Sequence, residues 1–150
     1  MTDWPHFTDG LADELAALPS GANLVIVETT PTNRGYYAQF HQEDHTLLAE
    51  LSGDDSLPAH TRPGPTGHRT IIDAGWQPPE TDHEHNWWIE LPWPLTSAIY
   101  QTLADMVVTG LRDGLGVESP DHLRYQAWNA KTGNTPLPLP ALGLQQEPSQ

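Results

Sequence analysis

A short run of histidines and acids is the part of the sequence that most resembles a metal site. Residues 82–85 read Asp-His-Glu-His and place two imidazoles two residues apart. On a strand both rings would point to one face, where His41 or His45 could complete the ligand set. Zinc sites generally need three or four ligands fixed by surrounding hydrogen bonds, and this run follows a stiff Pro-Pro linker. A solvated loop is the simpler interpretation, and a small metal-assisted hydrolase centred on His83 and His85 is the alternative.

The segment 41–45 forms a second polar cluster, His-Gln-Glu-Asp-His, which contains the base and the acid of a hydrolytic triad. Ser52 or Ser56 would have to supply the nucleophile. The sequence contains no G-x-S-x-G elbow, no phosphate-binding loop, no G-x-G-x-x-G and no HExxH motif. It also has no cysteine, which excludes disulfides and a cysteine nucleophile. We therefore assign no catalytic, metal or cofactor site and predict that the chain is not an enzyme.

Tryptophan is the other unusual residue type, and most of the tryptophans surround one predicted strand. These are Trp76, Trp87, Trp88, Trp93 and Trp128. Trp87 and Trp88 are neighbours, so on a strand they point to opposite faces. We expect Trp87 in the core and Trp88 partly exposed. By the same alternation, Tyr36 is expected in the core and Tyr37 outside it.

Exposed aromatic side chains predict a surface for a partner. Tryptophan and tyrosine combine a large apolar area with a polar group and are enriched at interfaces. One face of the predicted sheet packs on helices, and the other face needs a cover that a second polypeptide can provide. We therefore predict that Trp88, Tyr37, Trp93 and Trp128 bind a partner.

The first half of the chain predicts a helix followed by a three-stranded meander. Apolar residues recur three and four apart over 3–18, as in an amphipathic helix, and Asp3 is suited to cap it. Residues 22–30 are rich in β-branched types, and residues 36–41 and 47–51 alternate between two faces. The connections are too short for crossover helices, so these strands are expected to be antiparallel.

The second half predicts a short helix, two strands and the longest helix. Residues 66–74 are suited to a short helix or turn, which Gly75 can end in the left-handed conformation. Residues 85–92 and 121–130 alternate as strands do, and residues 95–115 follow the helical i, i+3, i+4 pattern. The predicted fold class is α+β: an antiparallel sheet with a three-stranded meander, on which an N-terminal helix and a long C-terminal helix pack.

The composition changes after residue 130. Residues 1–130 are predicted to form a single α+β domain, and residues 131–150 a Pro-rich tail that is extended or disordered. The run 137–140, Leu-Pro-Leu-Pro, favours polyproline II, which loses little entropy on binding. It could dock on an aromatic surface of its own chain or of a partner, but disorder is the simpler expectation.

Charge restricts the classes of partner. Twenty acids against six lysines and arginines give a net charge of −14. This charge repels polyphosphates and anionic lipid, so we expect no nucleic-acid and no membrane partner, and it favours a basic or neutral protein surface. The start of the chain lacks the basic and apolar regions of a signal peptide, and no apolar run approaches the ~18 residues of a membrane span. We therefore expect a cytoplasmic location.

A wider arrangement of residues resembles a known family. Its parts are, in order, Gly75-Trp76, Pro79, an acidic spacer, Asn86-Trp87-Trp88, Leu91-Pro92, a long amphipathic helix, Gly116-Val117, Leu123-Arg124-Tyr125 and Ala127-Trp128. Over residues 3–130 the chain resembles the TY-Chap family of actinobacterial proteins, which is related to YbjN and to type III secretion chaperones. The resemblance implies a secretion-chaperone-like fold, and it implies binding of peptides or partner proteins without catalysis.

Two non-catalytic functions follow from these observations. The leading one is a chaperone-like module that holds a partner polypeptide, the client, on an aromatic and apolar surface of the sheet. The acidic charge would steer a basic client toward it. The alternative is a structural homodimer domain, since the type III secretion chaperones that the chain resembles are commonly homodimers.

Overall fold

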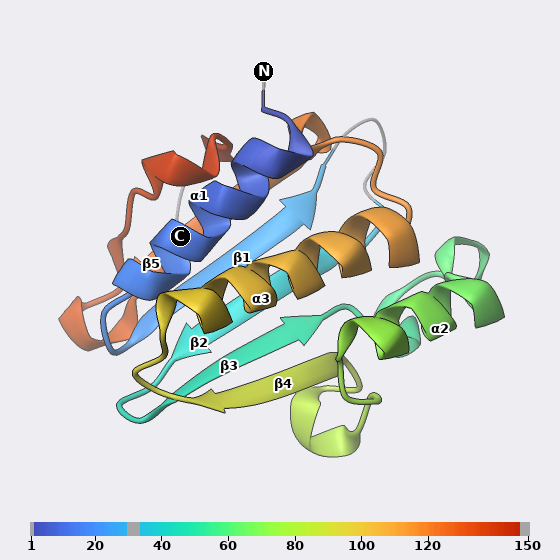
Figure 1. The fold of residues 1–150 in the computed structure, drawn as a ribbon, viewed down its shortest axis with the longest axis horizontal. Coiled ribbons are helices and arrows are strands. Elements are labelled where there is room, and N and C mark those ends of the chain that lie inside the picture. Colours follow the sequence, from blue (N-terminus) through green and yellow to red (C-terminus); the bar gives the residue numbers. More distant parts are fainter. Residues whose placement is uncertain (1, 30–33, 148–150) are drawn as a thin grey trace.

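The computed structural model describes residues 2–29 and 34–147 (Figure 1). Its helices are α1 (Trp4–Ala17), α2 (Gly64–Ala74) and α3 (Ser97–Val108), and a π-helical turn, Thr109–Gly114, continues α3. Its strands are β1 (Ala22–Glu28), β2 (Tyr37–Gln42), β3 (Thr46–Leu51), β4 (Trp87–Pro92), β5 (Leu123–Asn129), β6 (Thr135–Pro136) and β7 (Gln145–Gln146).

The strands form one sheet in the order β4-β3-β2-β1-β5-β6, with β7 beside β5. Neighbouring strands are antiparallel except for β5 and β7, which run parallel. The meander β1-β2-β3 is the one predicted, and β5 returns after α3 to pair with β1. The α+β fold class is therefore confirmed.

Helices α1 and α3 lie side by side over one face of this sheet (Figure 1). Helix α1 begins where the Asp3 carboxylate accepts the His6 backbone N–H at 2.9 Å, which satisfies a donor that the first turn leaves unpaired. Helix α3 begins in the same way at Thr96, whose hydroxyl accepts the Ile99 N–H at 3.3 Å. The side chains between these helices and the sheet form the core. Fully buried members are Phe7, Leu11, Leu15, Leu24, Ile26, Leu47, Leu51, Ile71, Leu111 and Leu142.

The predicted alternation of aromatic residues is confirmed. Trp87 and Tyr36 are each 4 % exposed and belong to the core. Trp88 and Tyr37 are partly exposed on the opposite side of the sheet. The alternation of a strand therefore assigned four aromatic side chains to the correct face.

Several boundaries differ from the prediction by a few residues: α3 begins at Ser97 rather than at residue 95, and β5 at Leu123 rather than at residue 121. Two further shifts have a clear local cause. Helix α2 begins at Gly64 rather than at residue 66, because Pro65 fits the first turn of a helix. It ends as predicted at Gly75, which has a φ of 117°. Strand β4 begins at Trp87 rather than at residue 85, because Glu84 and His85 have φ values of 57° and 61° and form a tight turn.

The tail differs more. Residues 131–147 pack on the rest of the chain, whereas the sequence predicted an extended or disordered segment and left docking on its own chain as the alternative. Leu142 is fully buried, Leu139 is 6 % exposed, and the pairs β5–β6 and β5–β7 extend the sheet. Residues 148–150 lie outside the described part. The tail docks because its leucines fill apolar space beside α1, and such a long-range contact cannot be predicted from composition.

Candidate functional site

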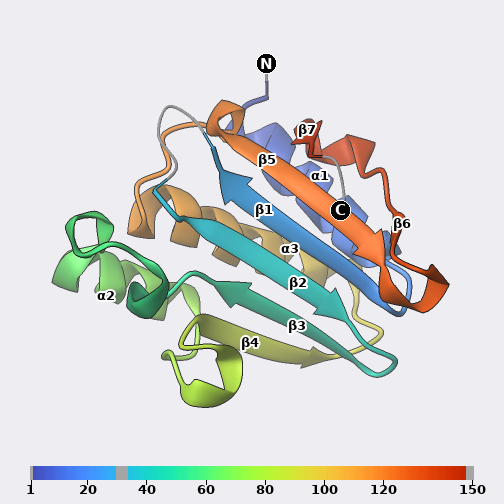
Figure 2. The ribbon, with the colours of Figure 1, turned by 180° about the vertical axis from the view of Figure 1, so that it is seen from behind.

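The side of the sheet away from α1 and α3 is called here the open face. Figure 2 shows β5, β1, β2 and β3 from this side, and no helix of the described residues passes over them. Strand register arranges its side chains in three rows that cross the strands. The first is Trp128, Asn23, His41, Leu48 and Glu90; the second is Gln126, Val25, Gln39, Glu50 and Trp88; the third begins Arg124, Val27 and Tyr37.

A groove of about 340 Å³ crosses the middle of the open face. Its apolar lining comes from Val25, Leu48 and Trp128. Its acidic lining is formed by Glu50 together with Asp82 and Glu84, two residues from the loop before β4 that stand over the sheet. From β5 to β4 the sheet spans about 19 Å, which is the length of about six extended residues. The groove thus offers apolar contact beside negative charge.

Glu50 is the acid in the floor of the groove, and it is only 4 % exposed. Its Oε1 accepts hydrogen bonds from Gln39 Nε2 at 2.6 Å and from Asn86 Nδ2 at 3.1 Å. Fully buried Asn86 also accepts the Gly53 N–H at 3.0 Å and donates to the Tyr37 hydroxyl at 2.9 Å. A buried polar group costs free energy unless it is paired, so this network holds the carboxylate and the Tyr37 ring in place.

Trp88 is covered on one side by its own chain. The His83 ring stacks on Trp88 with centroids 4.0 Å apart and planes 1° from parallel. His83 Nδ1 lies 3.0 Å from Glu80 Oε1, and Nε2 lies 3.2 Å from Glu90 Oε1. Burial lowers the pKa of His83, but the hydrogen bonds to Glu90 and Glu80 outweigh it, so the pKa lies above its usual value. The 80–86 loop is thereby fastened over the β4 end of the open face.

The two histidines of the predicted metal run do not share a face. His83 lies in a 3-10 turn against Trp88, whereas His85 points to Asp55, whose Oδ2 is 3.6 Å from Nδ1. The expectation of a common ligand pair is wrong, because the positive φ values at residues 84 and 85 break the strand alternation on which it rested. Within the described residues, no three His, Asp or Glu side chains are placed to hold a metal ion.

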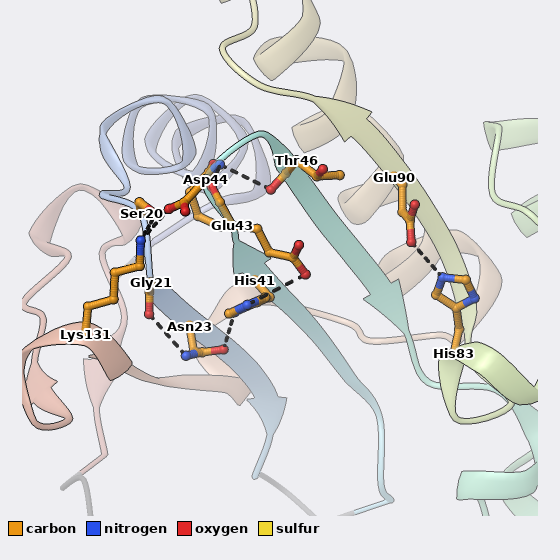
Figure 3. A network of polar contacts seen from close by, with 11 residues as sticks. Ser20, Gly21, Asn23, His41, Glu43, Asp44, Thr46, His83, Glu90 and Lys131 are labelled. Carbon is orange, nitrogen blue, oxygen red and sulfur yellow. Dashed lines mark hydrogen bonds and ion pairs between the residues drawn. The ribbon is translucent and has the colours of Figure 1, made fainter.

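The polar segment 41–45 is fastened to neighbouring elements (Figure 3). His41 Nδ1 lies 2.8 Å from Asn23 Oδ1, and Asp44 is bound by Ser20 and Lys131. The hydrogen bond from Lys131 lowers the pKa of the Asp44 carboxyl. Ser52 lies opposite Tyr37, about four residues or 13 Å along the strands from His41. Ser56 lies at the same end of the strands, with its Oγ 3.4 Å from the Tyr37 hydroxyl. The structure therefore assembles neither serine into a triad with the 41–45 segment.

Both edges of the sheet are covered or blunted. At the β4 edge, Gln77 exchanges two backbone hydrogen bonds with Trp88, of 2.9 and 3.3 Å. Pro92, on the same side of the strand, has no N–H to offer. At the β5 edge, the carbonyls of Tyr125, Ala127 and Asn129 accept N–H groups from residues 147, 137 and 134. A strand can therefore add to β5 only where the tail is displaced.

The structure places three of the four residues predicted to bind a partner on one face, although on different strands, and only Trp128 lines the groove. Tyr37, Trp88 and Trp128 are partly exposed on the open face. Trp93 lies apart, because the alternation continues past Pro92 and turns its side chain toward the helix-side core. Sequence reasoning missed Val25, Leu48 and Glu50, although the same alternation places them on the open face.

A family profile described as "TY-Chap3: T3SS (YopN, CesT) and YbjN peptide-binding chaperone 3" matches residues 1–129. The chain belongs to this family. The resemblance seen in the sequence is thus confirmed, and the observed helices and antiparallel sheet agree with a TY-Chap3 fold. Membership of TY-Chap3 indicates a peptide-binding, chaperone-like module with a polypeptide client and a binding role rather than catalysis. The match ends before the tail.

Two further comparisons complete this picture. No curated protein and no solved structure matches the chain. Among the described residues, none of the helices has the length and hydropathy needed to cross a bilayer.

Proposed function

We propose that the open face of this TY-Chap3 protein holds an extended, basic and apolar segment of a client polypeptide. The observation that carries the proposal is the groove itself, in which Trp128, Val25 and Leu48 lie beside a buried, hydrogen-bonded carboxylate. When another chain covers an apolar surface that its own chain leaves exposed, the complex is stabilised by roughly 25 cal/mol per Å² of apolar area buried. A cationic side chain at the acidic end of the groove would compensate the charge of Glu50.

Charge on the rest of the molecule supports a basic client. Asp82 and Glu84 line the groove together with Glu50, and the chain as a whole carries a net charge of −14. A negative surface of this kind raises the association rate of a positive partner, and the increase falls as salt screens the charges. We therefore expect the association rate to fall steeply with ionic strength, whereas dissociation should depend mainly on the aromatic contacts.

The edges of the sheet support binding to the face rather than addition of a strand. Gln77 and Pro92 leave few free backbone groups along β4, and the tail covers β5. Recognition on the face depends on side chains in the three rows. Tyr37 and Trp128 supply large rings with few rotatable bonds, so little side-chain entropy is lost when they bind.

The test starts from short random peptides selected on the immobilised wild-type chain. A fluorescent copy of the selected peptide is then titrated against the wild type, Trp128→Ala and Glu50→Gln. Loss of the ring at residue 128 should weaken binding by about 2 kcal/mol or more, as at interface hot spots. Glu50→Gln keeps the shape and one accepting oxygen but removes the charge that the client's cation would meet, so it should weaken binding of the basic peptide and reduce its dependence on salt.

The matched control is Ile72→Ala, because Ile72 is 45 % exposed on α2 and lies away from the open face. This variant should bind the peptide as the wild type does. Equal affinity of the wild type and Trp128→Ala, or selection of acidic peptides, would contradict the proposal.

A further inference from the structure

The C-terminal tail is bound mainly through its backbone. Leu137 N–H donates to the Ala127 carbonyl at 2.9 Å, and Leu139 N–H donates to the Tyr125 hydroxyl at 2.8 Å. Ala141 N–H donates to Glu14 Oε2 at 2.8 Å. From residue 137 to residue 141, every second residue thus gives its N–H to β5 or to α1.

Prolines occupy the positions between these donors. Residues 136, 138 and 140 are proline, and proline has no N–H to donate. Two leucines of the tail fill apolar space, since Leu139 is 6 % exposed and Leu142 is fully buried. The site therefore binds a segment in which proline alternates with a donor residue, with a short strand at Thr135–Pro136 and a 3-10 turn at Pro140–Leu142. Recognition through the backbone is a general mode of peptide binding.

Helix α1 is shaped for a backbone that crosses it. A β-carbon at Gly10 would overlap the carbonyl group of Ala141. The missing side chain of Gly10 thus leaves a notch in α1 that admits the tail. Glycine in the interior of a helix costs about 1 kcal/mol relative to alanine, so this notch reduces the stability of α1. Gly10 and the Glu14 acceptor lie within the part of the chain that the family profile matches, whereas the tail lies beyond it. Figure 1 shows the tail beside α1.

We propose that the channel between β5 and α1 is a second peptide-binding site, which the tail occupies in the free protein and which a client segment of alternating leucine and proline can enter in its place. The proposal goes beyond binding on the open face and does not depend on it. A tethered segment competes at an effective concentration in the millimolar range, so the tail would mask the site from weak ligands. The tail leaves the body at Gly133, so its release breaks none of the strand pairs among β1 to β5.

The probe is a fluorescent synthetic peptide with the sequence of residues 134–147, titrated against the full-length chain. In the variant Leu142→Asp a buried leucine becomes a carboxylate, so the tail should leave the channel. This variant should bind the peptide at least about tenfold more tightly than the wild type, because the tethered competitor is gone. Adding Gly10→Ala should abolish that binding, since the new methyl group blocks the notch, while α1 itself gains helix propensity. The control is Ile72→Ala added to Leu142→Asp: Ile72 is 45 % exposed on α2, away from β5 and α1, so this variant should bind the probe as Leu142→Asp alone does.

A second measurement needs no substitution. Saturating peptide should increase the amide hydrogen exchange of Leu137, Leu139 and Ala141 in the wild-type chain, since these N–H groups lose their acceptors. Two results would overturn the proposal. One is the absence of peptide binding to folded Leu142→Asp together with unchanged exchange in the wild type. The other is a wild-type dimer that exchanges tails, which would assign the channel to a second copy.

Discussion

The two faces of the sheet are formed by the same strands but differ in the types of residue that they carry. On the helix side, Leu24, Ile26, Leu47 and Leu51 are each 0 % exposed. On the open face the neighbouring positions carry amides, a histidine, a carboxylate and partly exposed aromatic rings. Under the helices apolar side chains are favoured, because each buried methylene group stabilises the fold. A polar group buried there would lower stability unless it found a hydrogen-bond partner. The open face is under no such requirement, and its mixture of polar and aromatic residues suits the client segment that we propose for it.

The largest expected effect separates the two faces at neighbouring residues, Trp87 and Trp88. Trp87 and Trp88 adjoin in β4 and point to opposite faces, and Trp87 is 4 % exposed. Trp87→Ala should lower the free energy of unfolding by about 3–5 kcal/mol, as large-to-small core changes do. Trp88→Ala should cost only about 1 kcal/mol, because it loses mainly one aromatic stack, and it should weaken peptide binding more than stability. Urea unfolding measures the free energy of unfolding of each variant. Equal losses of stability in the two variants would mean that the faces are not distinct.

The polar network under the open face comes next in size. Asn86→Ala removes the donor to Glu50 and the acceptor of the Gly53 N–H, both in a buried setting. We expect a loss of about 2–3 kcal/mol, the cost of leaving buried polar groups unpaired. Chemical denaturation checks the stability, and the double variant with Glu50→Gln should lose less than the sum of the single losses because the two residues interact. Strict additivity would show that the network is not a unit.

The smallest effect is a pH dependence that belongs to the loop over Trp88. His83 has a pKa raised above its ordinary value of 6.5, so protonation of its ring favours the folded chain. This stabilisation should be complete below about pH 6.5 and should be lost as the pH rises through the folded-state pKa. The melting temperature of the wild type should therefore fall, relative to that of His83→Gln, on going from about pH 6 to pH 8. Parallel melting curves across that range would show that the ring is not held by Glu80 and Glu90.

Much of the fold could be predicted, because alternation and helical spacing are local properties. They placed the meander, the helices α1 and α3, and the paired aromatics Trp87/Trp88 and Tyr36/Tyr37 on the correct sides. Trp93 was placed wrongly although the information was present, since residues 87, 89, 91 and 93 share a parity. Local patterns are sufficient to assign side chains to a face where the strand alternates regularly.

The remaining features depend on contacts between distant segments. Glu84 and His85 have left-handed backbone conformations, which are uncommon for residues other than glycine. The sequence therefore did not predict that the side chains of the two histidines point in different directions. The docked tail depends on Gly10 and Tyr125, which lie more than a hundred residues and more than ten residues away, respectively. The stacked pair His83–Trp88 likewise forms only because the loop folds back over β4.

We propose that the client segment binds on the open face, and NMR mapping of the bound peptide can locate it. The peptide selected on the wild-type chain is added to saturation, and the change of every backbone amide shift and of the indole N–H shifts is recorded. We expect the largest chemical-shift changes along the groove, at the amides of Val25, Gln39 and Leu48 and at the Trp128 indole N–H. Changes confined to the outer surfaces of α2 and α3, with these four signals unmoved at saturation, would contradict it.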